Sequence, residues 1–366
     1  MVDLVEELAG RVLGERYKLE SHLADGGMGA VWTAKDLKLG TDVAVKLMSV
    51  EGSMRADLRA RFEQEAKAVA LLRNRHVVEV LDYGTDGDTP FIVMELLDGI
   101  DLLATRDHKE SWQDWPLAEV AGLVIQVAQG LGAAHKMGII HRDVKPANIF
   151  LARSESPEDV VAKVIDFGIA KWAESKAILT ATNVALGSPS YMAPEQIRGQ
   201  KIDARVDAWA LAVVAFTLLT GELPFVGKNG PDIARQVVAG NRRFVEPPIP
   251  NAKRLERFFS RAFAQNPDAR FRSVEELAGE FVVAADAPGP LRTAARAVSE
   301  AVKDPEGMAE TQDAVTNKLV RGPKTPDVSS GERRADGRDE DLEETEIDDD
   351  RLNASAGAAG RTRRSG

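Results

Sequence analysis

One stretch near the middle of the chain brings an acid, a cation and an amide together, within the eight residues His141–Asn148, HRDVKPAN. A carboxylate such as Asp143 could accept the proton of an attacking hydroxyl, and Lys145 could neutralise phosphate charge during transfer. Asn148 could offer its amide oxygen to a divalent ion. These three side chains therefore provide a set of groups suited to phosphoryl transfer.

The neighbouring segments could position these groups. An apolar run with helical spacing, residues 118–137, precedes the stretch, and the strand-like residues 149–151 follow it. Near the N-terminus, Lys46 is embedded in the apolar strand Val43–Leu47, where a lysine is costly unless it meets an anion. A surface lysine is the alternative at this position. Just before this strand, the glycines of residues 24–31 would let backbone N–H groups approach phosphate oxygens.

Taken in order, these motifs resemble the bacterial eukaryotic-type (Hanks-type) Ser/Thr protein kinases. The resemblance rests on the glycine-rich loop, the strand lysine, the HRDVKPAN stretch, Asp166-Phe167-Gly168 placed 18 residues after Asn148, and Met192-Ala193-Pro194-Glu195. It implies an α+β, two-lobed kinase fold: a small lobe of antiparallel sheet with one helix, residues 17–97, and a mainly helical lobe, residues 98–285. Residues 1–16 would form a lead-in of one or two helical turns, and residues 286–366 a disordered acidic tail.

The family's roles carry over to matching positions. Asp143 would orient the substrate hydroxyl, Lys145 would bear charge, and Lys46 would pair with Glu65 of the next helix, with Glu63 as the competing carboxylate. Asn148 and Asp166 would ligate Mg²⁺ or Mn²⁺. The residues that would hold ATP are Ala24, Gly26, Gly27, Gly29, Val31, Ala44, Lys46, Met94, Glu95, Leu97 and Asp98.

Two of the nucleotide positions carry an alternative interpretation. Ala24 stands where the family usually has glycine, and its methyl group could stiffen the turn. Asp98 could reach the ribose, but Asp-Gly is also an ordinary turn.

The segment from 169 to 191 is polar and rich in small residues. Thr180 and Thr182, with Ser175 as a third candidate, occupy positions where the resemblance predicts activating phosphorylation. A phosphate there could pair with Arg142. The alternative is that these residues are unmodified loop hydroxyls.

Further along, two contacts follow from the resemblance. Glu195 should pair with Arg270, and the Asp207 carboxylate should accept hydrogen bonds from the catalytic-loop backbone. Ala212 replaces a glycine that is usual on the helix of Asp207. We expect the lobe to tolerate this change.

Composition limits the remaining classes of function. The 366 residues include no cysteine, which excludes a disulfide framework and fits a reducing, cytoplasmic location. The net charge is −11, and ten acidic residues with one arginine between Asp336 and Asp350 contribute −9 of it. There is no basic stripe typical of nucleic-acid binding, and no apolar run of the roughly 20 residues that a membrane span needs.

We therefore predict a Ser/Thr protein kinase that uses ATP, acts on protein Ser/Thr hydroxyls and self-associates for autophosphorylation. A nucleotide-binding scaffold of the pseudokinase type is the alternative. Loss of the strand lysine, of the base or of the metal ligands would indicate it, and this sequence keeps all of them.

Overall fold

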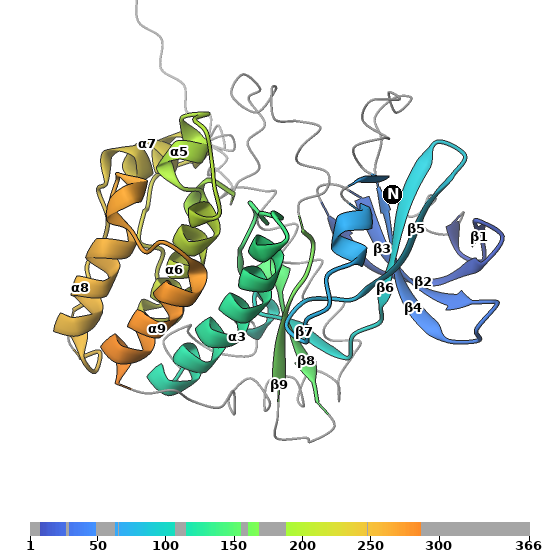
Figure 1. Cartoon of the computed structure of the whole chain (residues 1–366), viewed down its shortest axis with the longest axis horizontal. Helices are drawn as coiled ribbons and strands as arrows, with labels where there is room; N and C mark the ends of the chain where they lie inside the picture. The colour runs from blue at the N-terminus through green and yellow to red at the C-terminus, as the bar shows by residue number, and fades with distance from the viewer. Residues whose placement is uncertain are drawn as a thin grey trace, which may run out of the picture. The chain divides into compact units, whose positions relative to one another are not determined.

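The computed structural model describes residues 8–26, 29–48, 63–64, 66–106, 115–154, 160–167, 188–246 and 248–286 (Figure 1). Several predicted positions lie outside these residues: Gly27, Glu65, Gly168, Ser175, Thr180 and Thr182. The predicted acidic tail lies outside them as well, apart from Asp286.

An antiparallel sheet of six strands forms the N-terminal part, in the order β1-β2-β3-β4-β6-β5. Alternating burial along β3, where Trp32 and Ala34 are buried between partly exposed neighbours, gives the sheet one apolar face. That face packs with Tyr17, Phe91 and Val93 into a small core. The strands are β1 Val12–Leu13, β2 Tyr17–Gly26, β3 Gly29–Asp36, β4 Asp42–Met48, β5 Val80–Asp86 and β6 Thr89–Glu95.

The predicted helical turns of the lead-in fall mainly on residues 1–7, which lie outside the described residues. Leu8 is helical, and the chain continues in turns and the short strand β1. Leu13 of β1 pairs with Tyr17 and is 1% exposed, within the core of the sheet. Gly10 and Gly14 have φ values of +83° and +52°, which glycine adopts without strain and which interrupt a helix. Burial of the Leu13 side chain against the sheet therefore stabilises β1 at the edge of the sheet.

A second, three-stranded sheet, in the order β7-β8-β9, lies where the helical part begins. Its strands are β7 Gly99–Asp101, β8 Ile149–Arg153 and β9 Val160–Val164. Residues 66–70 are helical and bury Ala66 and Val69. The segment after them reaches the second sheet, because the Val78 amide donates to the carbonyl of Val164 at 3.0 Å and the Val164 amide donates to that of His76 at 2.8 Å.

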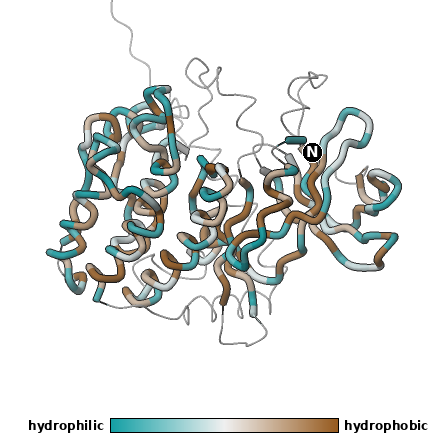
Figure 2. The backbone as a smooth tube through the Cα atoms, in the orientation of Figure 1, coloured by the Kyte–Doolittle hydropathy of each residue, from teal (hydrophilic) through white to brown (hydrophobic). Residues whose placement is uncertain are grey.

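Helices form the rest of the described chain, as the fold class predicts. Every residue of α6 from Val206 to Leu219 is buried, Ala212 included, so this helix is the centre of the C-terminal core. α8 is instead hydrophilic on one side and hydrophobic on the other, as the colours of Figure 2 show. The α-helices are α3 Leu117–Lys136, α5 Pro194–Ile197, α6 Arg205–Thr220, α7 Gly230–Ala239, α8 Ala252–Ala262 and α9 Val274–Ala285. The 3₁₀ turns are η1 Ala104–Arg106, η3 Pro146–Asn148, η4 Ser188–Tyr191 and η5 Pro267–Ala269.

Among the described residues, α3 alone has the length and apolar composition of a membrane-crossing helix. Within the protein, 67% of its most apolar stretch is buried. The core helix of a soluble protein meets the same criteria, so this helix is weak evidence for a membrane span.

Candidate active site

The backbone of the HRDVKPAN loop is held by a carboxylate from the buried helix α6. Asp207 is fully buried, and its two oxygens accept from the amides of His141 and Arg142, each at 2.8 Å. His135 of α3 also contacts it, with its Nε2 2.7 Å from Oδ2. These bonds hold Arg142 at φ +65°, a conformation that costs a non-glycine residue free energy. The contact between Asp207 and the loop backbone is the one that the sequence predicted.

His141 has a structural position within this loop. Its Nδ1 accepts from the Asp143 amide at 3.2 Å, so its Nε2, 2.9 Å from the carbonyl oxygen of Ile165, is the ring donor. Its ring lies 4.8 Å from that of Phe167 and is fully buried. Nδ1 therefore braces the loop internally, and Nε2 joins the loop to the segment that carries Asp166.

The side chains of Asp143, Lys145 and Asn148 converge. Lys145 Nζ lies 2.9 Å from Asp143 Oδ2, and Asn148 Nδ2 donates to the same oxygen at 3.2 Å and to the Asp143 carbonyl at 2.8 Å. The turn η3 makes this possible, because the Asn148 amide donates back to the carbonyl of Lys145 at 2.9 Å. These donors orient the carboxylate, as a hydroxyl-orienting base requires.

Lys46 and Asp166 face each other from the two sheets. Nζ of Lys46 lies 2.7 Å from Oδ1 of Asp166, and the side chains are 14% and 33% exposed. Asp166 has φ +58°, and the amide of Ile165 beside it donates to the Asn148 carbonyl at 3.0 Å. The anion that this lysine meets is thus Asp166, whereas Glu65, its predicted partner, lies outside the described residues.

These residues fit a divalent cation. The amide nitrogen of Asn148 is engaged with Asp143, which leaves its Oδ1 as the ligand atom. The carboxylate of Asp166 is partly open to solvent. An amide oxygen and a carboxylate are ligands that Mg²⁺ accepts, and its remaining ligands commonly come from water and phosphate.

The glycine-rich segment is the hairpin between β2 and β3. Gly26 pairs with Gly29, which has φ +139°, and Ala24 pairs with Val31. Ala24 is therefore part of the paired strand, where a methyl group is accommodated, and the chain reverses at the glycines. On the neighbouring strands, Val31 lies opposite Lys46.

The resemblance implies a hinge at residues 95–97, which begins at the last residue of β6, and a gatekeeper at Met94. Met94 pairs with Ala44 of β4, and both side chains are buried. Leu97 packs against the main core, whereas Asp98 is exposed. The described nucleotide positions thus lie on the β2–β3 hairpin, on β4 and β6 of the same sheet, and in the hinge that follows.

A family model described as "Protein kinase domain" matches residues 17–282. The chain belongs to the protein kinase family. Serine/threonine-protein kinase Pkn1 of Myxococcus xanthus is 38% identical over 292 residues, which are 78% of this chain and 40% of that protein. PknF of Mycobacterium tuberculosis is 36% identical over 263 residues, 72% of this chain and 55% of that one. The chain thus spans about half the length of the curated relatives that it matches.

Solved structures agree with this assignment. The crystal structure of the Mycobacterium tuberculosis PknI kinase domain superimposes with a TM-score of 0.58 at 29% identity, covering 75% of this chain and 98% of that one. The antiparallel sheet and the helical part therefore correspond to the two lobes of the kinase fold. Kinases of this family use ATP and a divalent metal, and they act on proteins.

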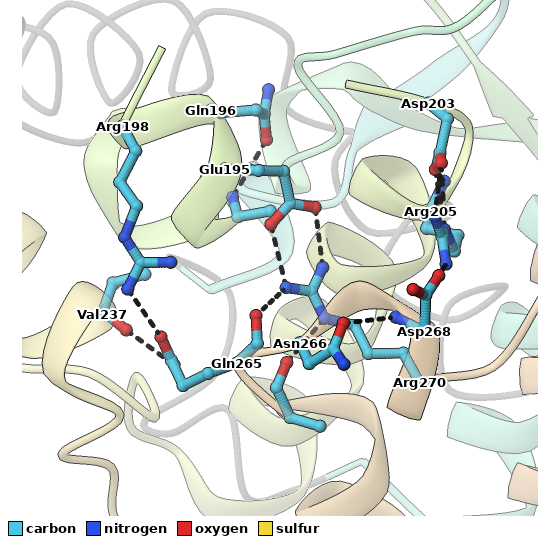
Figure 3. A network of polar contacts seen from close by, with 12 residues as sticks. Glu195, Gln196, Arg198, Asp203, Arg205, Val237, Gln265, Asn266, Asp268 and Arg270 are labelled. Carbon is cyan, nitrogen blue, oxygen red and sulfur yellow. Dashed lines mark hydrogen bonds and ion pairs between the residues drawn. The ribbon is translucent and has the colours of Figure 1, made fainter. Parts of the chain in front are cut away.

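The predicted ion pair between Glu195 and Arg270 is present in the helical lobe, as Figure 3 shows. The two NH groups of Arg270 donate to the two oxygens of Glu195 at 2.8 and 2.9 Å, and the side chains are 2% and 6% exposed. The arginine also donates to the carbonyl of Ala264 at 2.7 Å and lies 4.6 Å from the ring centre of Trp209. This pair joins α5, which carries the Ala-Pro-Glu sequence, to the loop before α9.

Sequence reasoning missed two contacts of this site. It left His135 without a partner, although the histidine anchors Asp207. It also passed over Lys163 of β9, which lies 2.7 Å from Glu95 of the hinge. The signal that found Lys46, a lysine within an apolar strand, is present at Lys163 in the run VVAKV.

Proposed function

We propose that this protein transfers the γ-phosphoryl group of ATP to Ser or Thr hydroxyls of proteins. The observation that carries the proposal is the Asp143 carboxylate, which Lys145 and Asn148 hold in a loop anchored by Asp207. The preference for Ser and Thr rests on Lys145, two residues after the base, as in Ser/Thr kinases. The domain would comprise residues 17–285, with the lobes meeting near residue 97.

Each side chain has a separate task in this mechanism. Asp143 accepts a hydrogen bond from the substrate hydroxyl and directs its lone pair in line with the γ-phosphate. Lys145 neutralises charge that develops on the transferred group, and Lys46 holds the α- and β-phosphates. Asn148 and Asp166 are the proposed metal ligands. A bound Mg²⁺ or Mn²⁺ would supply positive charge at the triphosphate.

Regulation would act through the segment after Asp166. We propose that two copies associate and phosphorylate Thr180 and Thr182, with Ser175 as a further candidate, and that the phosphates pair with Arg142. Double Thr→Ala substitution should then lower activity, and phosphopeptide mapping should find both sites occupied in active protein. Bare threonines together with unchanged activity of the double variant would refute this mode of regulation.

The transfer itself is tested with labelled ATP, Mg²⁺ or Mn²⁺ and a basic protein acceptor. Wild-type protein should incorporate phosphate, and Asp143→Asn should lower the rate roughly 10²- to 10⁴-fold because the base is lost. Lys46→Met should lower it as well, with weaker ATP binding. Cell fractionation would test the cytoplasmic location that the cysteine-free composition suggests.

The result that would contradict the proposal is ATP binding without transfer under either metal. The nucleotide-binding scaffold would then be the better interpretation. Asp143→Asn that binds ATP as wild type does would show that the lost rate belongs to the chemical step.

A further inference from the structure

The ion pair between Glu95 and Lys163 connects the two parts of the nucleotide site. Glu95 is the last residue of β6 and leads into the hinge, whereas Lys163 lies in β9, three residues before Asp166. Nζ of Lys163 is 2.7 Å from Oε1 of Glu95, and the side chains are 16% and 29% exposed. The pair is therefore better shielded from water than a typical surface ion pair.

Glu95 is held firmly on the side of the small lobe. Its amide donates to the carbonyl of Glu79 at 3.0 Å, and its Oε1 accepts from the Glu79 amide at 2.8 Å. The same oxygen thus receives a backbone donor from the residue before β5 and the ammonium of Lys163. Loss of the cation would leave this carboxylate, partly withdrawn from water, without its counter-charge.

Lys163 is held equally firmly on the side of the large lobe. It pairs with Phe150 of β8, and the next residue, Val164, pairs with Ile149, which follows Asn148 directly. The chain then runs to Asp166 with one further bond, from the Ile165 amide to the Asn148 carbonyl. A displacement of Lys163 would therefore be transmitted to both proposed metal ligands.

We infer that Lys163 is a positioning residue, which through Glu95 sets the distance between the hinge that binds adenine and the carboxylate that binds the metal. This inference rests on the proposed function, because its ligand is ATP with a divalent cation. ATP with its metal contacts both the hinge and Asp166, so its binding depends on the distance between them. A nucleoside contacts the hinge alone, so its binding does not depend on that distance.

This difference provides a test by binding alone. Breaking the ion pair should weaken binding of MgATP roughly three- to tenfold, which lies within the range of coupling found between contacting side chains. Adenosine, which has no phosphate and no metal, should bind within about twofold of wild type. Isothermal titration of the full chain with each ligand measures both values without requiring phosphoryl transfer.

The variants are Lys163→Met and the isosteric Glu95→Gln, with Lys163→Arg expected to restore MgATP binding. Lys35→Met is the matched control, because Lys35 Nζ lies at the same 2.7 Å from Asp42 but this ion pair links only β3 to β4 and does not reach β9. This control should bind both ligands as wild type does. Thermal unfolding of each variant establishes that it folds, and Glu95→Gln provides the test if Lys163→Met does not.

The outcomes separate the inference from the function on which it rests. Selective loss of MgATP binding in both variants, with rescue by arginine, supports the inference. Equal losses for adenosine and MgATP, or no loss, would overturn it while leaving the kinase proposal intact. Wild-type protein that binds no MgATP would overturn both.

Discussion

In the catalytic loop, hydrogen bonds to a buried carboxylate maintain an uncommon backbone conformation. Arg142 and Asp166 both have positive φ, a conformation in which L-residues are uncommon. The two bonds that Asp207 accepts from the loop amides hold the first of them. The residue types at these positions are therefore only part of the site, since their backbone geometry depends on a helix that comes much later in the chain.

A second buried carboxylate at the residue scale gives a pH-dependent prediction. The Arg16 guanidinium donates to both oxygens of Asp36 and lowers the pKa of this carboxyl to about 2, with further donors from the amides of Leu39 and Lys38. Because the folded pKa lies below the unfolded value, the stabilisation is present above about pH 4 and is lost as pH falls through about 2.

The measurement is the free energy of unfolding between about pH 5 and about pH 2, for wild type and Asp36→Asn. The wild type should lose more stability over this interval than the variant, whose side chain does not titrate. Asp42→Asn, at the exposed ion pair with Lys35, should follow the wild type closely. Parallel curves for wild type and Asp36→Asn would show that the carboxylate is not the source of the acid sensitivity.

At the scale of elements, close approach between segments decides which side chains can be present. Gly130 of α3 lies against the segment before β5, where an added Cβ would come within 2.4 Å of the carbonyl oxygen of His76. His76 itself is buried and its Nδ1 lies 3.0 Å from the Ala162 carbonyl oxygen of β9. The contact between the lobes at this point therefore requires a glycine on the helix.

We expect Gly130→Ala to destabilise the protein by about 1 to 3 kcal/mol, because a backbone oxygen cannot move aside as a flexible side chain would. Gly279→Ala is the matched control, since an added Cβ in α9 meets no atom within 4 Å. That change should stabilise by about 0.5 to 1 kcal/mol through helix propensity. Chemical denaturation of both variants checks the signs. Equal effects would contradict the steric argument.

The buried pair of Glu195 and Arg270 gives the second prediction at this scale. Glu195→Gln leaves an arginine that is 2% exposed without its counter-charge, so the cost should be about 3 to 5 kcal/mol of unfolding free energy. Arg235→Gln breaks an exposed pair with Asp232 and should cost less than about 1 kcal/mol. Urea denaturation compares the two. Similar small losses would indicate that solvent reaches the buried pair.

At the scale of the molecule, the described core reaches its end with α9. Phe281, Ala284 and Ala285 are buried against the same cluster as α6. At the other end, β1 completes the N-terminal sheet, so Leu13 belongs to the folded unit although the family match begins at residue 17. The described core therefore extends from Leu13 in β1 to Ala285 at the end of α9.

Because the composition of residues 287–366 predicts a disordered tail, a chain cut after Asp286 should keep its stability, with a melting temperature within about 2 °C of the full chain and unchanged MgATP affinity. Deletion of residues 1–16 should instead lower the melting temperature, because the core loses Leu13 and Asp36 loses its partner Arg16. Calorimetry of the two truncations makes the comparison. A large loss in the first would place core contacts beyond residue 286.

The sequence by itself determined the family and the two-lobed fold, and it predicted the roles that we propose for Lys46, Asp143 and Asn148. Order and spacing of charged residues within apolar strands are local properties, and the period of the hydrophobic pattern follows from backbone geometry.

Only the tertiary structure decided the partners of these groups. Val12 and Leu13 form a strand because Leu13 packs on the apolar face of the sheet, and His135 contacts Asp207 across 72 residues. Lys163 met Glu95 because β9 runs beside the hinge. Each outcome depends on which distant segment supplies the counter-charge or the apolar surface, and a linear pattern does not contain that information.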